Sequence, residues 1–213
     1  VTINAPADDV HLDAGSIDNS IASTSGGNFE NVVIANDASN PVTTTITDTV
    51  DVTTVSLSAE ANEVEGGMIT YTASVDNATD TDMTVNLSNG ATITILAGAT
   101  SGAVDVAAQT DDVYVDASTE NVSITTTSGG NFESLVIDPA VTTTAIADTI
   151  DDTTITLSAT GSVAEGGQIT YTATIDNAAD GDMTVNLTDG TTITILDGQT
   201  TGNVTINAPA DDV

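Results

Sequence analysis

Carboxylates are the main reactive groups of this sequence, which has 32 Asp and Glu, one His and no Lys or Arg. The acids gather at short spacing in three sets that recur along the chain. Hard oxygens from Asp, Glu and Asn are the ligands that Ca²⁺ prefers, six to eight at a time, and exported modules bind it at roughly 10⁻⁴–10⁻³ M. We therefore predict Ca²⁺ as the cofactor and interpret the three sets as its candidate ligands.

The sets are defined by their place in the chain. The linker set lies in two Asp-Thr-x-Asp segments, and acids of adjacent loops are expected to reach it; it comprises Asp48, Asp51, Asp148, Asp151 and Asp152, with Glu65, Glu165, Asp111 and Asp112 joining from the loops. The turn set comprises Asp76, Asp80 and Asp82, repeated as Asp176, Asp180 and Asp182. The paired set comprises Asp8, Asp9 and Asp13, repeated as Asp111, Asp112 and Asp116.

The calcium signal is one of composition and position. Neither the EF-hand loop nor the Gly-rich nonapeptide of β-rolls is present. Asp and Asn also form turns without any metal, which is the alternative explanation for each set. Adjacent carboxylates such as Asp8 and Asp9 are costly without a partner, however, because like charges oppose ionisation. A net charge of −32 adds repulsion that no side-chain cation offsets.

The missing residue types exclude several classes of function. Without cations the chain cannot neutralise nucleic-acid phosphates or an anionic membrane surface. Without Cys it has no disulfide, thiolate zinc site or Cys nucleophile. Paired carboxylates can hydrolyse glycosides, but here they lie in repeated loops of a chain with 2% aromatics. We expect no enzyme and no small-molecule substrate. Tyr114 replaces His11, the single His, in the other copy, so we interpret position 11 as a tolerated strand position.

Internal repeats set the domain organisation. Residues 53–113 align without gaps on residues 153–213, and residues 10–34 align on residues 113–137. We predict that residues 1–51 are the C-terminal half of a preceding repeat, residues 52–149 a complete repeat, and residues 150–213 the N-terminal part of the following one. Either neighbouring repeats complete the two halves, or the halves pair with other chains.

Alternating apolar residues predict β-strands throughout. Strands are expected at 69–75, 83–87, 92–96, 104–108, 113–115, 122–126, 135–137 and 143–147. Asn89-Gly90 predicts a type I′ hairpin turn, and the two Ser-Gly-Gly-Asn-Phe loops predict tight turns with Phe29 and Phe132 packed inward. No helical period is present. The fold class is therefore all-β: tandem immunoglobulin-like antiparallel β-sandwiches arranged end to end.

The motifs Glu65-Gly-Gly-Met-Ile-Thr-Tyr-Thr-Ala73, Asp111-Asp112-Val113 and Asp148-Thr-Ile-Asp151 resemble the extender repeats of giant bacterial RTX adhesins, of the biofilm-adhesin and marine ice-binding-adhesin type. The resemblance covers essentially the whole chain. It implies tandem immunoglobulin-like domains whose acidic linkers bind calcium and become rigid. It also implies an extracellular location on the bacterial cell surface, reached by type I secretion.

The resulting prediction is a structural extender module, stiffened by calcium, that projects an adhesive tip for cell attachment or biofilm formation. Its expected partners are neighbouring repeats of the same chain or other copies of itself. Two alternatives remain open. One is a subunit of an extracellular filament that assembles end to end, and the other is a sugar- or ice-binding adhesin domain.

Overall fold

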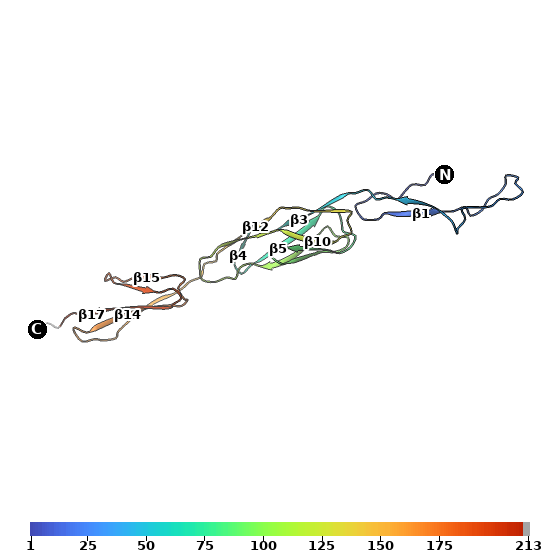
Figure 1. The fold of residues 1–213 in the computed structure, drawn as a ribbon. Helices are drawn as coiled ribbons and strands as arrows, with labels where there is room; N and C mark the ends of the chain where they lie inside the picture. The colour runs from blue at the N-terminus through green and yellow to red at the C-terminus, as the bar shows by residue number, and fades with distance from the viewer. Residues whose placement is uncertain (211–213) are drawn as a thin grey trace. The chain divides into compact units, whose positions relative to one another are not determined.

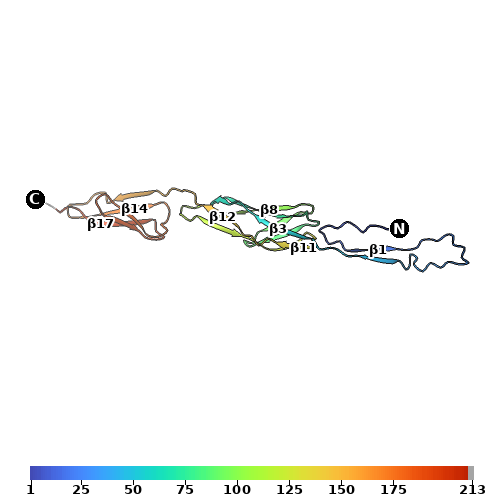
Figure 2. The same cartoon turned by 90° about the horizontal axis from the view of Figure 1, so that it is seen from above.

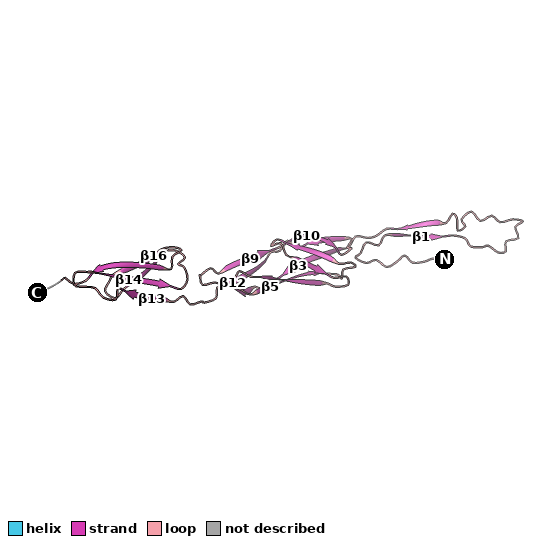
Figure 3. Ribbon diagram, turned by 90° about the horizontal axis from the view of Figure 1, so that it is seen from below, coloured by secondary structure: helices cyan, strands magenta, loops and turns pink. Residues whose placement is uncertain are grey.

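The computed structural model describes residues 1–210, and these residues contain strands and no helix (Figure 3). The chain divides into two compact units, of which the first comprises Val1–Glu63, Met68–Ala107 and Thr119–Ala145. The second comprises Val64–Gly67, Ala108–Ser118 and the chain from Ile146 onward. No described helix is long and apolar enough to cross a membrane.

The first unit holds most of a β-sandwich. One sheet has the order β11 (Ser134–Ile137), β3 (Val52–Ser58), β5 (Met68–Val75) and β8 (Ser101–Ala107). A second has the order β10 (Ile124–Gly129), β6 (Met83–Leu87) and β7 (Thr92–Ile95). A third has the order β4 (Asn62–Val64), β12 (Thr142–Ala147) and β9 (Ser118–Val122). Figures 1 and 2 show these strands gathered in one body.

Strict alternation explains why these segments form strands with one buried face. On β5, Ile69, Tyr71 and Ala73 are almost fully buried, whereas the residues between them are half-buried. Met83 and Val85 on β6 complete the core from the other sheet. Gly90 has φ of 86° in the connection that joins β6 to β7, so the predicted hairpin is present. The predicted type I′ turn is wrong, because that turn needs positive φ at both central residues and Asn89 does not have it. The all-β immunoglobulin-like sandwich class is therefore confirmed.

Three details of the strand prediction are wrong. The pair β11·β3 is parallel, so the sandwich is not purely antiparallel. Residues 113–115 form a bend, because the Asp112 carboxylate accepts the Tyr114 N–H and a side-chain turn competes with strand pairing. Residues 122–126 are divided between β9 and β10, because Ser123 interrupts the strand and the segments on either side pair in different sheets.

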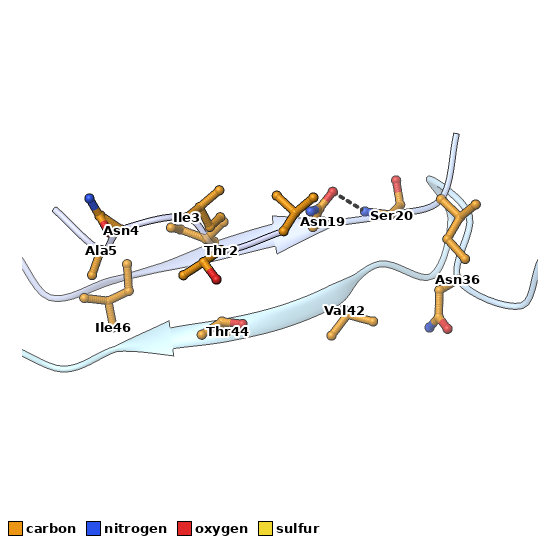
Figure 4. A pocket seen from close by; sticks show the side chains of 13 residues that line it. Thr2, Ile3, Asn4, Ala5, Asn19, Ser20, Asn36, Val42, Thr44 and Ile46 are labelled. Atoms are coloured by element: carbon orange, nitrogen blue, oxygen red, sulfur yellow. Dashed lines mark hydrogen bonds between the residues drawn. The ribbon is translucent and has the colours of Figure 1, made fainter. Parts of the chain in front are cut away.

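The N-terminal part of the first unit has only one hairpin, formed by β1 (Gly15–Asn19) and β2 (Val42–Ile46). Residues 1–5 lie over this hairpin around a groove of about 650 Å³, lined in part by Ile3, Val42 and Ile46 (Figure 4). Phe29 is 74% exposed whereas Phe132 is 8% exposed, so the inward packing predicted for Phe29 is wrong. The physical reason is that the loop around Phe132 packs on Met83, and residues 21–34 have no such strand beside them.

The second unit contains a smaller group of strands that repeats the first half of the sandwich. β13 (Ile155–Ala159), β14 (Gln168–Ile175) and β17 (Thr201–Asn207) form one antiparallel sheet, and β15 (Met183–Asn186) pairs with β16 (Thr192–Ile195) (Figure 1). Ala173, Ile175, Ile193 and Ile195 form its core. The boundaries predicted for the three repeats remain a prediction, and residues 211–213 of the last one lie outside the described residues.

Candidate metal centre

The first acidic cluster lies in the second unit and is built around Glu65. This residue begins the turn between β4 and β5, where its N–H donates to the Ala147 carbonyl at 3.1 Å. The next residue, Gly66, has a φ of 70° and donates to the Gln109 carbonyl at 2.7 Å. These backbone bonds hold the Glu65 side chain where only 4% of the residue is exposed.

Glu65, Asp116 and Asp148 each place a carboxylate oxygen within 4.8 Å of the others. Gln109 donates to Glu65 Oε1 at 3.2 Å and also to Asp116. Glu65 Oε2 and Asp148 Oδ1 are buried and have no protein donor. A buried carboxylate oxygen without a donor carries a desolvation cost, and this chain has no Lys or Arg side chain to offset it.

The electrostatics of this cluster favour either a proton or a cation. The hydrogen bond between the Glu65 and Asp116 carboxyls, desolvation, and the charges of Asp116 and Asp148 raise the pKa of Glu65 to about 7. The negative charges that oppose ionisation are also the charges that would attract a dication. Oxygens from three carboxylates suit Ca²⁺, which accepts hard oxygen ligands.

A second acidic cluster lies in the first unit, where Asp8, Asp48 and Glu133 bring one oxygen each within 4.8 Å. Glu133 Oε2 accepts the Asp51 N–H at 2.6 Å, whereas Glu133 Oε1 is buried without a donor. The Asp51 N–H lowers the pKa of Glu133, but desolvation and the charges of Asp48 and Asp51 outweigh it, so that pKa is raised.

The two clusters share one repeat position, that of Asp48 and Asp148. Asp8 and Asp111 correspond, and they accept equivalent hydroxyl hydrogen bonds from Thr49 and Thr149, although only Asp8 belongs to a cluster. Asp48 and Asp148 also correspond, as do Asp13 and Asp116. The Asp13 N–H donates to Asp48 Oδ2 at 3.3 Å, and desolvation followed by the charges of Asp9 and Asp48 raises the pKa of Asp13. The repeat therefore places carboxylates together at both sites.

The rest of the linker and paired sets has other partners. Asp9 and Asp112 each accept the N–H of the residue two positions later, at 2.8 Å and 2.7 Å. Asp51 contributes its N–H to Glu133, and Asp111 accepts from Thr149. Among the described residues, three further candidates are exposed and belong to neither cluster: Asp151, Asp152 and Glu165.

The turn set does not converge. Asp76 accepts the Thr54 N–H at 3.1 Å, and Asp82 accepts the Ala97 N–H at 2.8 Å. Asp80 accepts the Asn131 amide at 3.0 Å, and Asp182 accepts the Asp197 N–H at 2.9 Å. Within residues 1–210, no group of three acids forms around these residues, nor around Asp176 and Asp180. The alternative explanation of turn formation fits the turn set.

Glu133 and Gln109 are the participants that the sequence reasoning missed. Glu133 ends the repeated Ser-Gly-Gly-Asn-Phe-Glu segment, so its recurrence at Glu30 was the available signal. Gln109 has no such signal, since it joins the cluster only through its contacts with Glu65 and Asp116. Glu133 is 82 residues from Asp51, and Gln109 is 44 residues from Glu65, although it is 7 residues from Asp116.

Comparison with known proteins finds a family. The family model described as LapA domain matches residues 1–49, 51–149 and 151–213. No curated protein matches the chain. A crystal structure of CBD12 from CALX1.2 is similar over 74% of this chain and 77% of that chain, with 14% sequence identity and a TM-score of 0.35. This likeness is too low to support an argument about function.

Proposed function

The chain belongs to the LapA domain family of biofilm adhesins and so comes from a cell-surface or extracellular protein; from this premise we propose that it is a non-enzymatic extender module stiffened by calcium. Its task is to hold an adhesive tip away from the cell during attachment or biofilm formation. Its partners are the neighbouring repeats of the same secreted chain, and type I secretion is the proposed export route.

The observation that carries this proposal is the Glu65 carboxylate, which is buried, lacks a donor at Oε2 and lies beside Asp116 and Asp148. A dication there would supply the missing partner for Glu65 Oε2 and Asp148 Oδ1 together. It would also convert the mutual repulsion of three carboxylates into attraction toward one ion. Backbone carbonyls or water would complete the six to eight oxygens that Ca²⁺ takes.

The two clusters suggest complementary tasks at one joint, by which we mean a linker and the two repeats that it connects. Glu65, Asp116 and Asp148 belong to one repeat, so an ion there ties a linker to the domain that precedes it. In the other cluster Asp8 and Asp48 lie in residues 1–51 and Glu133 lies in residues 52–149, so an ion there joins successive repeats. Because Asp48 and Asp148 are equivalent, we propose that a complete joint holds both ions and that this linker Asp is shared between them.

Binding to the ordered joint alone stabilises it by RT ln(1 + [L]/Kd), which is about 2.7 kcal/mol when calcium is 100 times Kd. Without the ion, clustered carboxylates repel and the joint flexes. This mechanism requires that calcium bind the folded joint more tightly than the flexible one.

Small-angle scattering of the chain in millimolar calcium and in EDTA tests the proposal. We expect a longer maximum dimension and a narrower set of conformations with calcium. Magnesium at equal concentration is the matched control, because it demands a tighter octahedral geometry and keeps its waters. Equal maximum dimensions in calcium and in EDTA would refute the stiffening.

A further inference from the structure

Residues 11 and 114 occupy the same repeat position and make the same contact. His11 Nε2 lies 3.0 Å from the Ala78 carbonyl oxygen, and the Tyr114 hydroxyl donates to the Ala178 carbonyl at 2.8 Å. Since a carbonyl can only accept, His11 must carry its ring proton on Nε2. The two residues differ in chemistry but share a ring with a donor at its far end. Their acceptors, Ala78 and Ala178, are also equivalent in the repeat.

The donor side of this contact is held by an Asx turn at both places. Asp9 Oδ1 accepts the His11 N–H at 2.8 Å, and Asp112 Oδ1 accepts the Tyr114 N–H at 2.7 Å. Such a turn fixes the backbone without help from neighbouring strands. It therefore directs the ring at position 11 or 114 before the contact forms.

The acceptor side is equally fixed. The residue after each accepting alanine donates its N–H across the loop, from Thr79 to Ala99 at 3.0 Å and from Ala179 to Gln199 at 2.9 Å. The carbonyl of residue 78 or 178 is thus held in place by the adjoining bond. Both halves of the contact are preorganised, which lowers the entropy lost when it forms.

The first site adds backbone bonds to the side-chain contact. The His11 ring stacks on Phe132 with centroids 5.4 Å apart. Leu12 donates its N–H to the Asn131 carbonyl at 3.1 Å, and Glu133 donates to the Val10 carbonyl at 3.1 Å. Residues 10–12 thus lie as a short bridge against residues 131–133.

We propose that position 11/114 is a latch that fastens a segment in the C-terminal half of one repeat onto a loop of the next, independently of metal. The hydrogen bond at Ala78 or Ala178 joins an uncharged carbonyl to a ring donor, so chelation leaves it in place. The latch restricts the positions of the two segments that it joins. The carboxylates of each cluster then have fewer arrangements to sample before they come together. The inference rests on the proposed function as an extender module, but the latch itself requires no cation.

The test uses the full chain in EDTA with two substitutions at residue 11. His11→Phe keeps a ring that can stack on Phe132 and removes the donor, whereas His11→Tyr keeps both ring and donor. The measurement is amide hydrogen exchange of Leu12 and Glu133. We expect exchange to be faster in His11→Phe by roughly two- to tenfold, the range for one net hydrogen bond, and to remain near wild type in His11→Tyr.

Equal exchange in wild type and His11→Phe would overturn the latch, because packing alone would then hold the bridge. Equal acceleration in His11→Phe and His11→Tyr would also overturn it, because the donor would then be irrelevant.

At the second site, Tyr114→Phe removes only the hydroxyl. Residual dipolar couplings in EDTA should then show larger motion between residues 52–149 and residues 153–207, whereas unchanged motion would count against the latch. Tyr171→Phe is the matched control, since the Tyr171 hydroxyl has no hydrogen bond among the described residues, and it should leave this motion unchanged. The spacer proposal fails separately, if calcium leaves the scattering of the wild-type chain unchanged.

Discussion

The acids around Glu65 and the acids of the loop at residues 76–82 have the same chemistry and different surroundings. Glu65 is buried beside two other carboxylates and keeps an oxygen without a donor. Asp76 and Asp82 accept backbone N–H bonds that shape their own turns. Dense spacing in the sequence therefore does not identify a ligand. We therefore propose as metal ligands those carboxylates whose oxygens the fold leaves without protein donors.

The largest effect is expected for Glu65→Gln, with Asp82→Asn as the matched control. In EDTA at pH 8, Glu65→Gln should be at least as stable as wild type, because it removes a repelled buried charge. With calcium at 100 times Kd, wild type should gain about 2.7 kcal/mol and Glu65→Gln should lose most of that gain. Urea unfolding with and without calcium measures both. Asp82→Asn should keep the full calcium gain. If Glu65→Gln also keeps it, Glu65 is not a calcium ligand and the two regions do not differ in this respect.

Glu65 should make the free energy of unfolding of the metal-free chain depend on pH, because the pKa of Glu65 is raised from 4.5 to about 7. In the metal-free chain, the folded state holds a proton that the unfolded state releases. The stability contributed by protonated Glu65 is complete below pH 4.5 and is lost as pH rises through 7. The measurement is the difference in unfolding free energy between wild type and Glu65→Gln in EDTA across pH 4–8, which cancels the general repulsion of a net charge of −32. A difference that does not change with pH would contradict this environment for Glu65.

Glu133→Gln tests whether the second cluster behaves as the first does. Its amide oxygen can still accept the Asp51 N–H, so the fold should persist in EDTA. The calcium gain should fall by less than in Glu65→Gln, because Glu133 is only half-buried. Isothermal titration with calcium measures the loss as fewer or weaker binding events. Unchanged titration would remove this cluster from the proposed joint.

The smallest effect is expected for Asp82→Ala, which removes the acceptor for the Ala97 N–H. The cost should be about 1 kcal/mol, the net value of one hydrogen bond, and it should be equal with and without calcium. Asp182→Ala removes the corresponding acceptor for Asp197 and should behave alike. A calcium-dependent cost in either variant would return the turn set to the list of candidate ligands.

Local pattern was enough to predict most of the strands in residues 52–149. Alternation at residues 69–75 and 83–87 corresponds to observed strands, and the Asn89-Gly90 signal corresponds to an observed hairpin, because side-chain period and turn preference are properties of adjacent residues. The type I′ form of that turn was predicted wrongly. Prediction failed at residues 113–115, where the Asp112 side chain competes for the backbone. Metal binding by the acids stays a prediction, and their grouping into two clusters was not predictable from spacing.

Two nearly identical segments show what the amino acids alone could not settle. Residues 124–137 form β10 and β11, which pair with β6 and β3, whereas residues 21–34 form no strand. Composition and local order established the β character, the turns and the negative charge. Whether a segment became a strand, and whether Glu65 met Asp116 and Asp148, depended on partners distant in the chain. Strand hydrogen bonds and carboxylate clusters are contacts between such partners, so only the folded arrangement could decide them.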